Sequence, residues 1–143
     1  MKKATIPLVV CVLLSVYGCS TRKLPPGPTG LYQLEGDWQL VSTTDDDSAL
    51  NGTVISVDPV TADGMITVLQ KNRYCVRPTD VMWKELSTSA GSGQFKAGCL
   101  VSSCISGLEY KPATLQLLNN EVRLTGTNAY GKFLLQTWRR RPK

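Results

Sequence analysis

Apolar and polar residues alternate along much of the chain after residue 35. In residues 36–44, Trp38 and Leu40 fall on one face of an extended segment, and Gln39 and Val41 fall on the other. A period of two in a composition rich in Trp, Leu, Val and Thr predicts a β-strand with one buried face. Similar short runs follow, so the pattern predicts a protein built from strands.

The clearest strand pair lies in the last third of the chain. Residues 114–118 and 121–125 both alternate, and they flank Asn119 and Asn120. Asn tolerates the positive φ that two-residue hairpin turns need, so this stretch predicts a β-hairpin.

Strand signals cover most of the remaining domain, and helix signals are nearly absent. Residues 79–86 are the only candidate for a helical turn. About eight or nine short strands separated by turn residues predict an all-β protein, either an antiparallel barrel or a sandwich. Beyond those already named, strands are expected at residues 53–57, 65–69, 73–76, 94–98, 105–110 and 132–140.

The start of the chain has a different pattern, that of an export signal. Lys2 and Lys3 form a basic head, and residues 6–16 form an apolar run broken at two positions. A basic head, a short apolar run and a small residue at the cleavage point are the parts of a secretory signal peptide. The run is too short to cross a bilayer, which takes about 20 helical residues. We expect residues 1–18 to be a signal helix that is removed.

Residues 16–19, Val-Tyr-Gly-Cys, resemble the lipobox of bacterial lipoproteins. In that family the cysteine sulfur receives a diacylglycerol, the chain is cut just before this cysteine, and the new N-terminus is acylated. The resemblance implies that Cys19 is the first mature residue and the lipid anchor to the membrane. Because Ser20 rather than Asp follows it, the resemblance implies residence in the outer membrane, facing the periplasm or the cell surface.

A flexible tether is expected over residues 19–35. Residues 24–30 include three prolines and two glycines, which neither continue a helix nor fit a central strand. A second interpretation is that residues 31–34 fold back onto the domain or insert into a partner. The expected order is signal peptide (1–18), lipidated cysteine with tether (19–35), and β-barrel domain (36–143).

The composition argues against catalysis. The chain has no histidine, which removes Ser-His and Cys-His catalysis and histidine-ligated metal sites. Glu35 and Asp37 are the only candidate pair of catalytic carboxylates, and beside a linker they are expected to be solvated. We expect a protein that is not an enzyme and that holds no cofactor and no metal.

The net charge does not indicate a nucleic-acid-binding protein. The formal net charge is +5 at pH 7, but Lys2 and Lys3 leave with the signal peptide. Four of the remaining positive residues lie within residues 139–143. A nucleic-acid surface would instead spread Lys and Arg over a face, so no nucleic-acid partner is expected.

Cys75, Cys99 and Cys104 remain in the mature domain. Disulfides form outside the cytoplasm, and three cysteines allow one disulfide and one free thiol. Bridging Cys75 to Cys99 or to Cys104 closes a loop of about 25–30 residues, which restricts the unfolded chain more than bridging Cys99 to Cys104. We expect Cys75 to pair with one of the other two.

The two ends of the domain carry a further pattern. Residues 36–38 are Gly-Asp-Trp and open the first strand, while residues 138–140 are Trp-Arg-Arg and end the last. This arrangement resembles the lipocalin-like (calycin) barrels, in which a Gly-x-Trp packs beside an arginine from the end of the last strand by cation–π contact. The resemblance implies a small antiparallel up-and-down barrel closed by Trp38 and either Arg139 or Arg140.

Two inhibitor families share shorter elements with the chain. Residues 36–40, Gly-Asp-Trp-Gln-Leu, are similar to the first strand of small periplasmic protease inhibitors, which are eight-stranded barrels that insert an N-terminal segment into their target. Residues 106–110 resemble the Ser-Gly-x-x-Tyr element of lysozyme-inhibitor lipoproteins.

The predicted function is binding rather than catalysis. The calycin resemblance implies a lipid-anchored envelope protein that binds a small apolar ligand or assists envelope assembly. The alternative is a periplasmic inhibitor of a protease or lysozyme, or another module that binds an envelope protein. A pocket inside the barrel would favour the first function, and a filled barrel with an ordered N-terminal arm would favour the second.

Overall fold

The computed structural model describes residues 28–45, 50–70, 75–104 and 107–143. The predicted signal peptide, Cys19 and most of the predicted tether lie outside the described residues.

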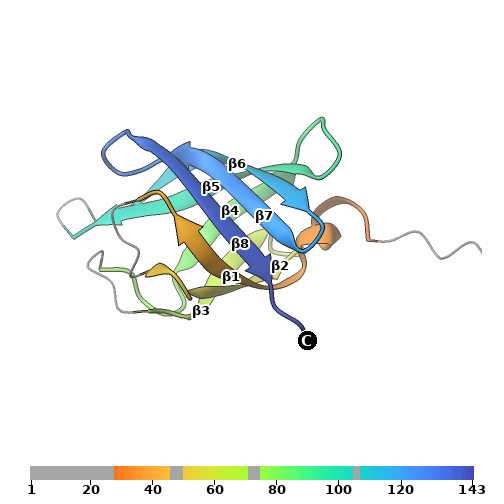
Figure 1. Cartoon of the computed structure of the whole chain (residues 1–143), viewed down its shortest axis with the longest axis horizontal. Coiled ribbons are helices and arrows are strands. Elements are labelled where there is room, and N and C mark those ends of the chain that lie inside the picture. Colours follow the sequence, from red (N-terminus) through yellow and green to blue (C-terminus); the bar gives the residue numbers. More distant parts are fainter. Residues whose placement is uncertain (1–27, 46–49, 71–74, 105–106) are drawn as a thin grey trace, which may run out of the picture.

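Eight antiparallel strands form a closed barrel (Figure 1). Each strand pairs with the next along the chain, and the last pairs with the first, so the predicted all-β up-and-down barrel is confirmed. In chain order the strands are β1 (Gly36–Thr43), β2 (Val54–Asp58), β3 (Asp63–Val68), β4 (Val81–Thr88), β5 (Gln94–Ser103), β6 (Gly107–Leu118), β7 (Glu121–Thr127) and β8 (Phe133–Arg140).

Three sequence predictions about local structure were wrong. The expected helical turn at residues 79–86 is instead the greater part of β4, because Trp83 is fully buried and β4 pairs with both β3 and β5. The expected strand at residues 73–76 is absent from its described part, where Cys75 and Val76 belong to the β3–β4 connection. Tertiary pairing outweighed local preference in the first case.

The third wrong prediction concerns β6. The separate strands expected at residues 105–110 and 114–118 are, in their described part, one strand, β6, which pairs with β5 without a break through Pro112.

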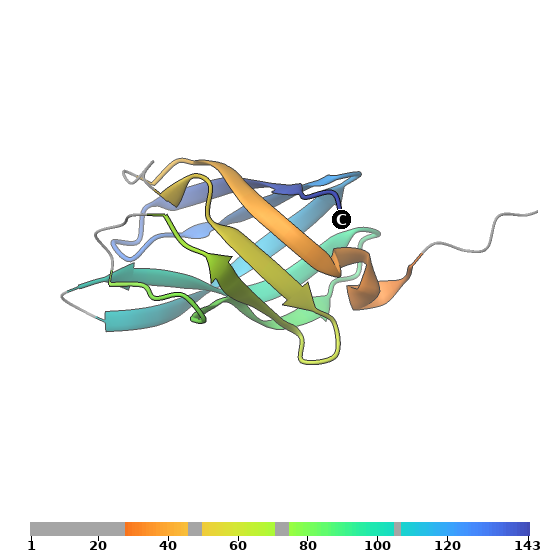
Figure 2. The ribbon, with the colours of Figure 1, turned by 90° about the horizontal axis from the view of Figure 1, so that it is seen from below.

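The end of the predicted tether is also ordered. Gly30–Leu34 forms a 3₁₀ helix, η1, and Leu34 is fully buried. Gly36 has a φ of 112°, a left-handed conformation suited to glycine, and it turns the chain from η1 into β1. Figure 2 shows η1 at one end of the barrel, which we call the base, close to the C-terminus. The opposite end, where β5 meets β6 and β7 meets β8, is called the mouth.

Side chains fill the barrel at the level of its three tryptophans. Trp38, Trp83 and Trp138 are all fully buried, and the rings of Trp83 and Trp138 meet edge to face with centroids 5.1 Å apart. The Trp138 indole N–H donates to Gln136 Oε1 at 3.0 Å. Aromatic pairs of this kind contribute beyond the area that they bury. Trp83 is therefore a core residue.

Arg140 closes the base over Trp38. Its guanidinium lies 4.2 Å from the centre of the Trp38 indole and donates to the carbonyl oxygens of Gln33 and Glu35. The Trp38 indole N–H in turn donates to the Leu34 carbonyl at 2.8 Å. Burial lowers the pKa of Arg140, and the Glu35 carboxylate opposes that shift. One cation thus joins β8, β1 and η1.

Arg139 takes no part in this closure. Trp38 and Arg140 are direct cross-strand partners, whereas Arg139 pairs with Gln39 and is exposed on the outer face. Successive strand residues point to opposite faces, so only one of the two arginines can reach the indole. The structure therefore assigns the closing role to Arg140.

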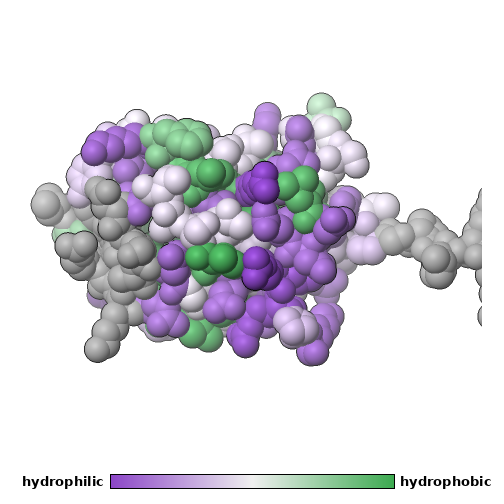
Figure 3. Space-filling view, viewed as in Figure 1, coloured by the Kyte–Doolittle hydropathy of each residue, from purple (hydrophilic) through white to green (hydrophobic). Residues whose placement is uncertain are grey.

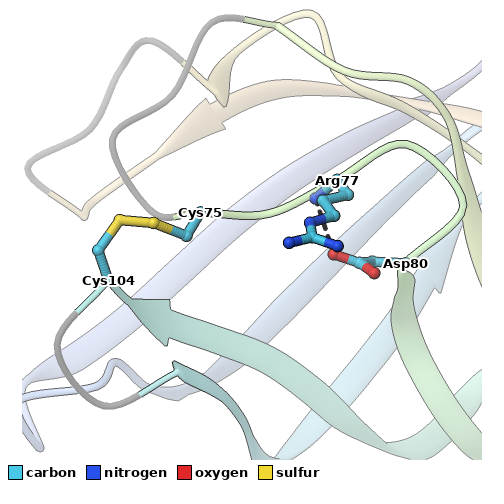
Figure 4. Close-up of a disulfide and its surroundings, with 4 residues drawn as sticks. All are labelled: Cys75, Arg77, Asp80 and Cys104. Atoms are coloured by element: carbon cyan, nitrogen blue, oxygen red, sulfur yellow. Dashed lines mark hydrogen bonds between the residues drawn. A yellow bond between two sulfur atoms is a disulfide. The ribbon is translucent and has the colours of Figure 1, made fainter.

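A disulfide joins two connections at the mouth. Cys75, in the β3–β4 connection, is bonded to Cys104, which follows β5 (Figure 4). Beyond the disulfide, the Arg77 N–H donates to Asp80 Oδ2 at 2.7 Å and orders the turn into β4. Of the three cysteines in the described residues, Cys99 is the one with a free thiol, and it is buried within β5. The expectation of one disulfide formed by Cys75 is confirmed, with Cys104 as its partner.

Substitutions at the base test the closure. Trp38→Ala should lower the free energy of unfolding by about 3–5 kcal/mol, as for a large buried aromatic. Arg140→Ala should lower it by about 1 kcal/mol or more, because cation–π contact and hydrogen bonds are both lost. Denaturant unfolding of the single variants and of the double variant with Trp38→Ala gives the coupling energy.

Arg139→Ala is the matched control for that cycle. It should change stability little and should show no coupling to Trp38. Equal, weak effects of both arginine substitutions would contradict the closure.

Removal of the disulfide gives a second test of the fold. The bond closes a loop with a sequence separation of 29, so replacing Cys75 and Cys104 by Ser should cost about 3–4 kcal/mol in the chain-entropy account. Unfolding with and without reductant measures this: reductant should destabilise the parent but leave the double variant unchanged. A non-reducing peptide map that links Cys75 to Cys99 would overturn the pairing.

Candidate functional site

Among the described residues, the interior of the barrel offers little room near the mouth. A cavity of about 30 Å³ lies among apolar side chains that include Leu40, Leu50, Met82 and Leu134. Small-molecule sites usually measure about 300–1,000 Å³, whereas this cavity is close to the space that one water molecule needs. A ligand could enter here only if these side chains moved.

The outer face of the barrel carries a larger depression, which we call the outer groove. It has a volume of about 840 Å³ and crosses the strands from β4 to the start of β8. Its lining residues are Lys84, Glu85, Lys96, Ala97, Gly98, Tyr110, Lys111, Pro112, Ala113, Thr114, Thr125, Gly126, Thr127 and Phe133.

Small residues on neighbouring strands account for the groove. Gly98 pairs with Pro112, and Thr114 pairs with Thr125, so short side chains or none lie side by side on β5, β6 and β7. A Cβ atom on Gly98 would come within 3.1 Å of the Lys84 side chain. The glycine therefore leaves space for Lys84 to lie across β5.

Lys84 and Tyr110 form one wall of the groove. The Lys84 ammonium lies 4.3 Å from the centre of the Tyr110 ring, and the Tyr110 hydroxyl donates to the Val81 carbonyl at 2.7 Å. Burial raises the pKa of Tyr110, and the carboxylates of Asp80 and Asp63 raise it further. The phenol is therefore neutral at physiological pH and serves as a fixed aromatic platform under the cation.

Phe133 forms the opposite wall and is held by the β7–β8 turn. Phe133 is 66% exposed, so its ring can contact a partner. The buried Asn128 side chain fixes the turn by accepting from the N–H groups of Tyr130 and Lys132, at 3.0 and 2.9 Å. Figure 3 shows hydrophobic side chains near this turn among largely hydrophilic neighbours.

The three lysines of the groove differ in their hydrogen-bond and ion-pair partners. Lys111 donates to the carbonyls of Asn128 and Ala129, and Lys84 lies 4.0 Å from Glu85 Oε1. Lys96 is exposed, and no acceptor among the described residues lies within hydrogen-bonding or ion-pair distance of its ammonium. Lys96 is therefore available to a partner.

The residues singled out from sequence lie elsewhere. Trp38 and Arg140 are structural residues of the base, and Cys19 is outside the described residues. Glu35 and Asp37 are both exposed at the base. The outer groove was missed, because its floor comes from residues on several strands whose register could not be read from one sequence.

Two features of the described residues bear on possible chemistry. Burial raises the pKa of Cys99 to about 12, so this thiol is not a nucleophile at neutral pH. In residues 28–45, 50–70, 75–104 and 107–143, no three acidic or cysteine side chains gather in a way that could hold a metal ion. The same residues include no helix with the length and apolar character needed to span a bilayer.

Comparison with known proteins adds no relative: no protein-family model, curated protein or solved structure matches the chain.

Proposed function

We propose that this protein is a non-catalytic binding protein, held on the bacterial outer membrane by lipid on Cys19, whose barrel binds an envelope protein at the outer groove. This proposal is based on the difference in volume between the cavity near the mouth and the outer groove. The cavity near the mouth measures about 30 Å³, and the outer groove measures about 840 Å³.

The segment before β1, residues 31–35, is held against the barrel. This favours binding at the outer groove rather than insertion of that segment into a target. Inhibitors that act by inserting an N-terminal segment need that segment free. Here Leu34 is buried, and the carbonyls of Gln33 and Glu35 accept hydrogen bonds from Arg140. Inhibition of a protease or lysozyme by this chain would therefore use the outer face of the barrel.

Binding of a small apolar ligand inside the barrel is the second candidate. The lining of the cavity near the mouth, which is apolar apart from Asp45 and Gln136, favours it. It requires Leu134, Met82 or their neighbours to move apart, at the cost of packing that a filled core has already gained. A role in envelope assembly is compatible with either binding mode.

The anchor is tested by Cys19→Ser in the full chain. The variant should take up no labelled palmitate, because the thiol that receives the diacylglycerol is gone, and it should remain uncleaved or be released from the membrane. The parent protein should be labelled and should fractionate with the outer membrane. Equal labelling of the two proteins would end the lipoprotein proposal, and fractionation with the inner membrane would end the outer-membrane assignment.

Binding at the groove is tested by photocrosslinking in intact membranes. A benzoylphenylalanine placed at Thr125, in the groove, should yield a crosslinked protein adduct. The same group at Gln39, exposed on β1, is the control and should not. Thr114→Trp, which fills the groove, should abolish the adduct. Equal adducts from both positions, or an adduct that persists in the filled variant, would contradict the proposal.

A further inference from the structure

Charge is divided unevenly around the barrel. The described residues between 36 and 80, which supply β1 to β3, have 5 Asp and one Arg, for a net charge of −4. Residues 81–143, which supply β4 to β8, have 9 Lys and Arg against 3 Glu, for a net charge of +6, and four of these positive residues lie within residues 139–143. Because the strand order in the barrel follows the chain, these segments form an acidic arc and a basic arc.

The outer groove lies wholly on the basic arc. Every residue of its lining falls between Lys84 and Phe133. Charges of one sign along a groove attract ligands of the opposite sign and raise their association rate. The occupant of this groove should therefore carry negative charge.

The lining combines charged, aromatic and hydroxyl side chains, and this limits the kinds of ligand that the groove can bind. Three lysines and one glutamate line the groove, so its charge is modest. Nucleic acids and similar polyanions are bound by dense Lys and Arg surfaces that neutralise many phosphates. The lining also includes Tyr110, Pro112 and, on the opposite wall, Phe133, which suit apolar side chains, and threonine hydroxyls, which suit peptide groups.

The closed barrel limits one common way of binding a peptide. A peptide adds a strand only beside a free edge, and among the described strands the overhanging start of β6, residues 107–113, pairs with β5 but not with β7. Over the rest of the groove, side chains must make the contacts. A segment that carries a few carboxylates together with apolar residues matches the lysines and aromatic rings of the groove lining.

We propose that the outer groove binds an acidic, extended segment of a partner protein, with carboxylates at Lys84 and Lys96 and apolar side chains against Tyr110, Pro112 and Phe133. This inference rests on the proposed function, since it assumes that the groove is the binding site. It adds the chemistry of the partner, which the proposed function leaves open.

The experiment selects peptides from a random nine-residue display library on the detergent-solubilised full chain. Enriched peptides are synthesised with a fluorescent label, and their affinities are measured by anisotropy. We expect them to carry at least two Asp or Glu around apolar residues and to weaken as salt rises. Replacement of their Asp and Glu by Asn and Gln should reduce binding.

Charge-matched variants locate the bound peptide. Lys96→Glu should weaken binding at least about fivefold, since one exposed ion pair is worth up to about 1 kcal/mol and its reversal adds repulsion. Arg139→Glu changes the net charge equally on the same arc, but it lies outside the groove lining and should have little effect.

The outcomes separate the two proposals. Neutral or basic peptides that depend on Lys96 would overturn the acidic partner and leave the groove as the site. Acidic peptides that bind equally to the parent and to Lys96→Glu would overturn the groove itself. Failure to enrich any peptide, with binding instead to phosphatidylglycerol vesicles or to a second copy of the chain, would overturn the peptide proposal.

Discussion

The contact of Arg140 with Trp38 and η1 is the interaction on which the rest of the barrel depends. It joins the last strand to the first and to the segment before it, across a separation of 105 residues between Arg140 and Glu35. Closing so long a loop costs conformational entropy. The cation–π contact, the hydrogen bonds to the carbonyls of Gln33 and Glu35, and the buried indole act at one place to offset that cost. Closure also removes the free strand edges that would otherwise invite pairing with other chains.

Because the closed barrel is filled by side chains, the candidate binding surface lies on its outer face. Trp38, Trp83 and Trp138 are fully buried inside the barrel, so the residues available to a partner are those that face outward. On β5 to β7 these outward residues are small, and they leave a groove between Lys84 with Tyr110 and the exposed Phe133. The barrel serves in this account as a rigid support whose outer face differs in charge from one arc to the next.

Much of the fold could be predicted from the sequence, because alternation and turn chemistry are local properties. The hairpin of β6 and β7 is an example: Asn119 has a φ of 57°, as the turn requires. The partner of Cys75 could not be chosen, because both loops have similar lengths. The barrel decides it by burying Cys99 within β5 and bringing Cys104 to the mouth. The helical turn at residues 79–86 was a wrong prediction because burial of Trp83 and strand pairing depend on distant residues, and the groove depends on register across several strands.

Nuclear magnetic resonance of the base tests the central claim most directly. The account predicts nuclear Overhauser contacts between the Trp38 ring and the Arg140 side chain, with Arg140 side-chain protons shifted upfield by the indole. The Trp38 indole N–H is buried and donates a hydrogen bond to the Leu34 carbonyl. Its hydrogen should therefore exchange with solvent as slowly as the backbone amides of the core strands. Arg139 should show neither the contacts nor the shift. Fast exchange of that indole N–H, or equal shifts for Arg139 and Arg140, would contradict closure of the barrel by this contact.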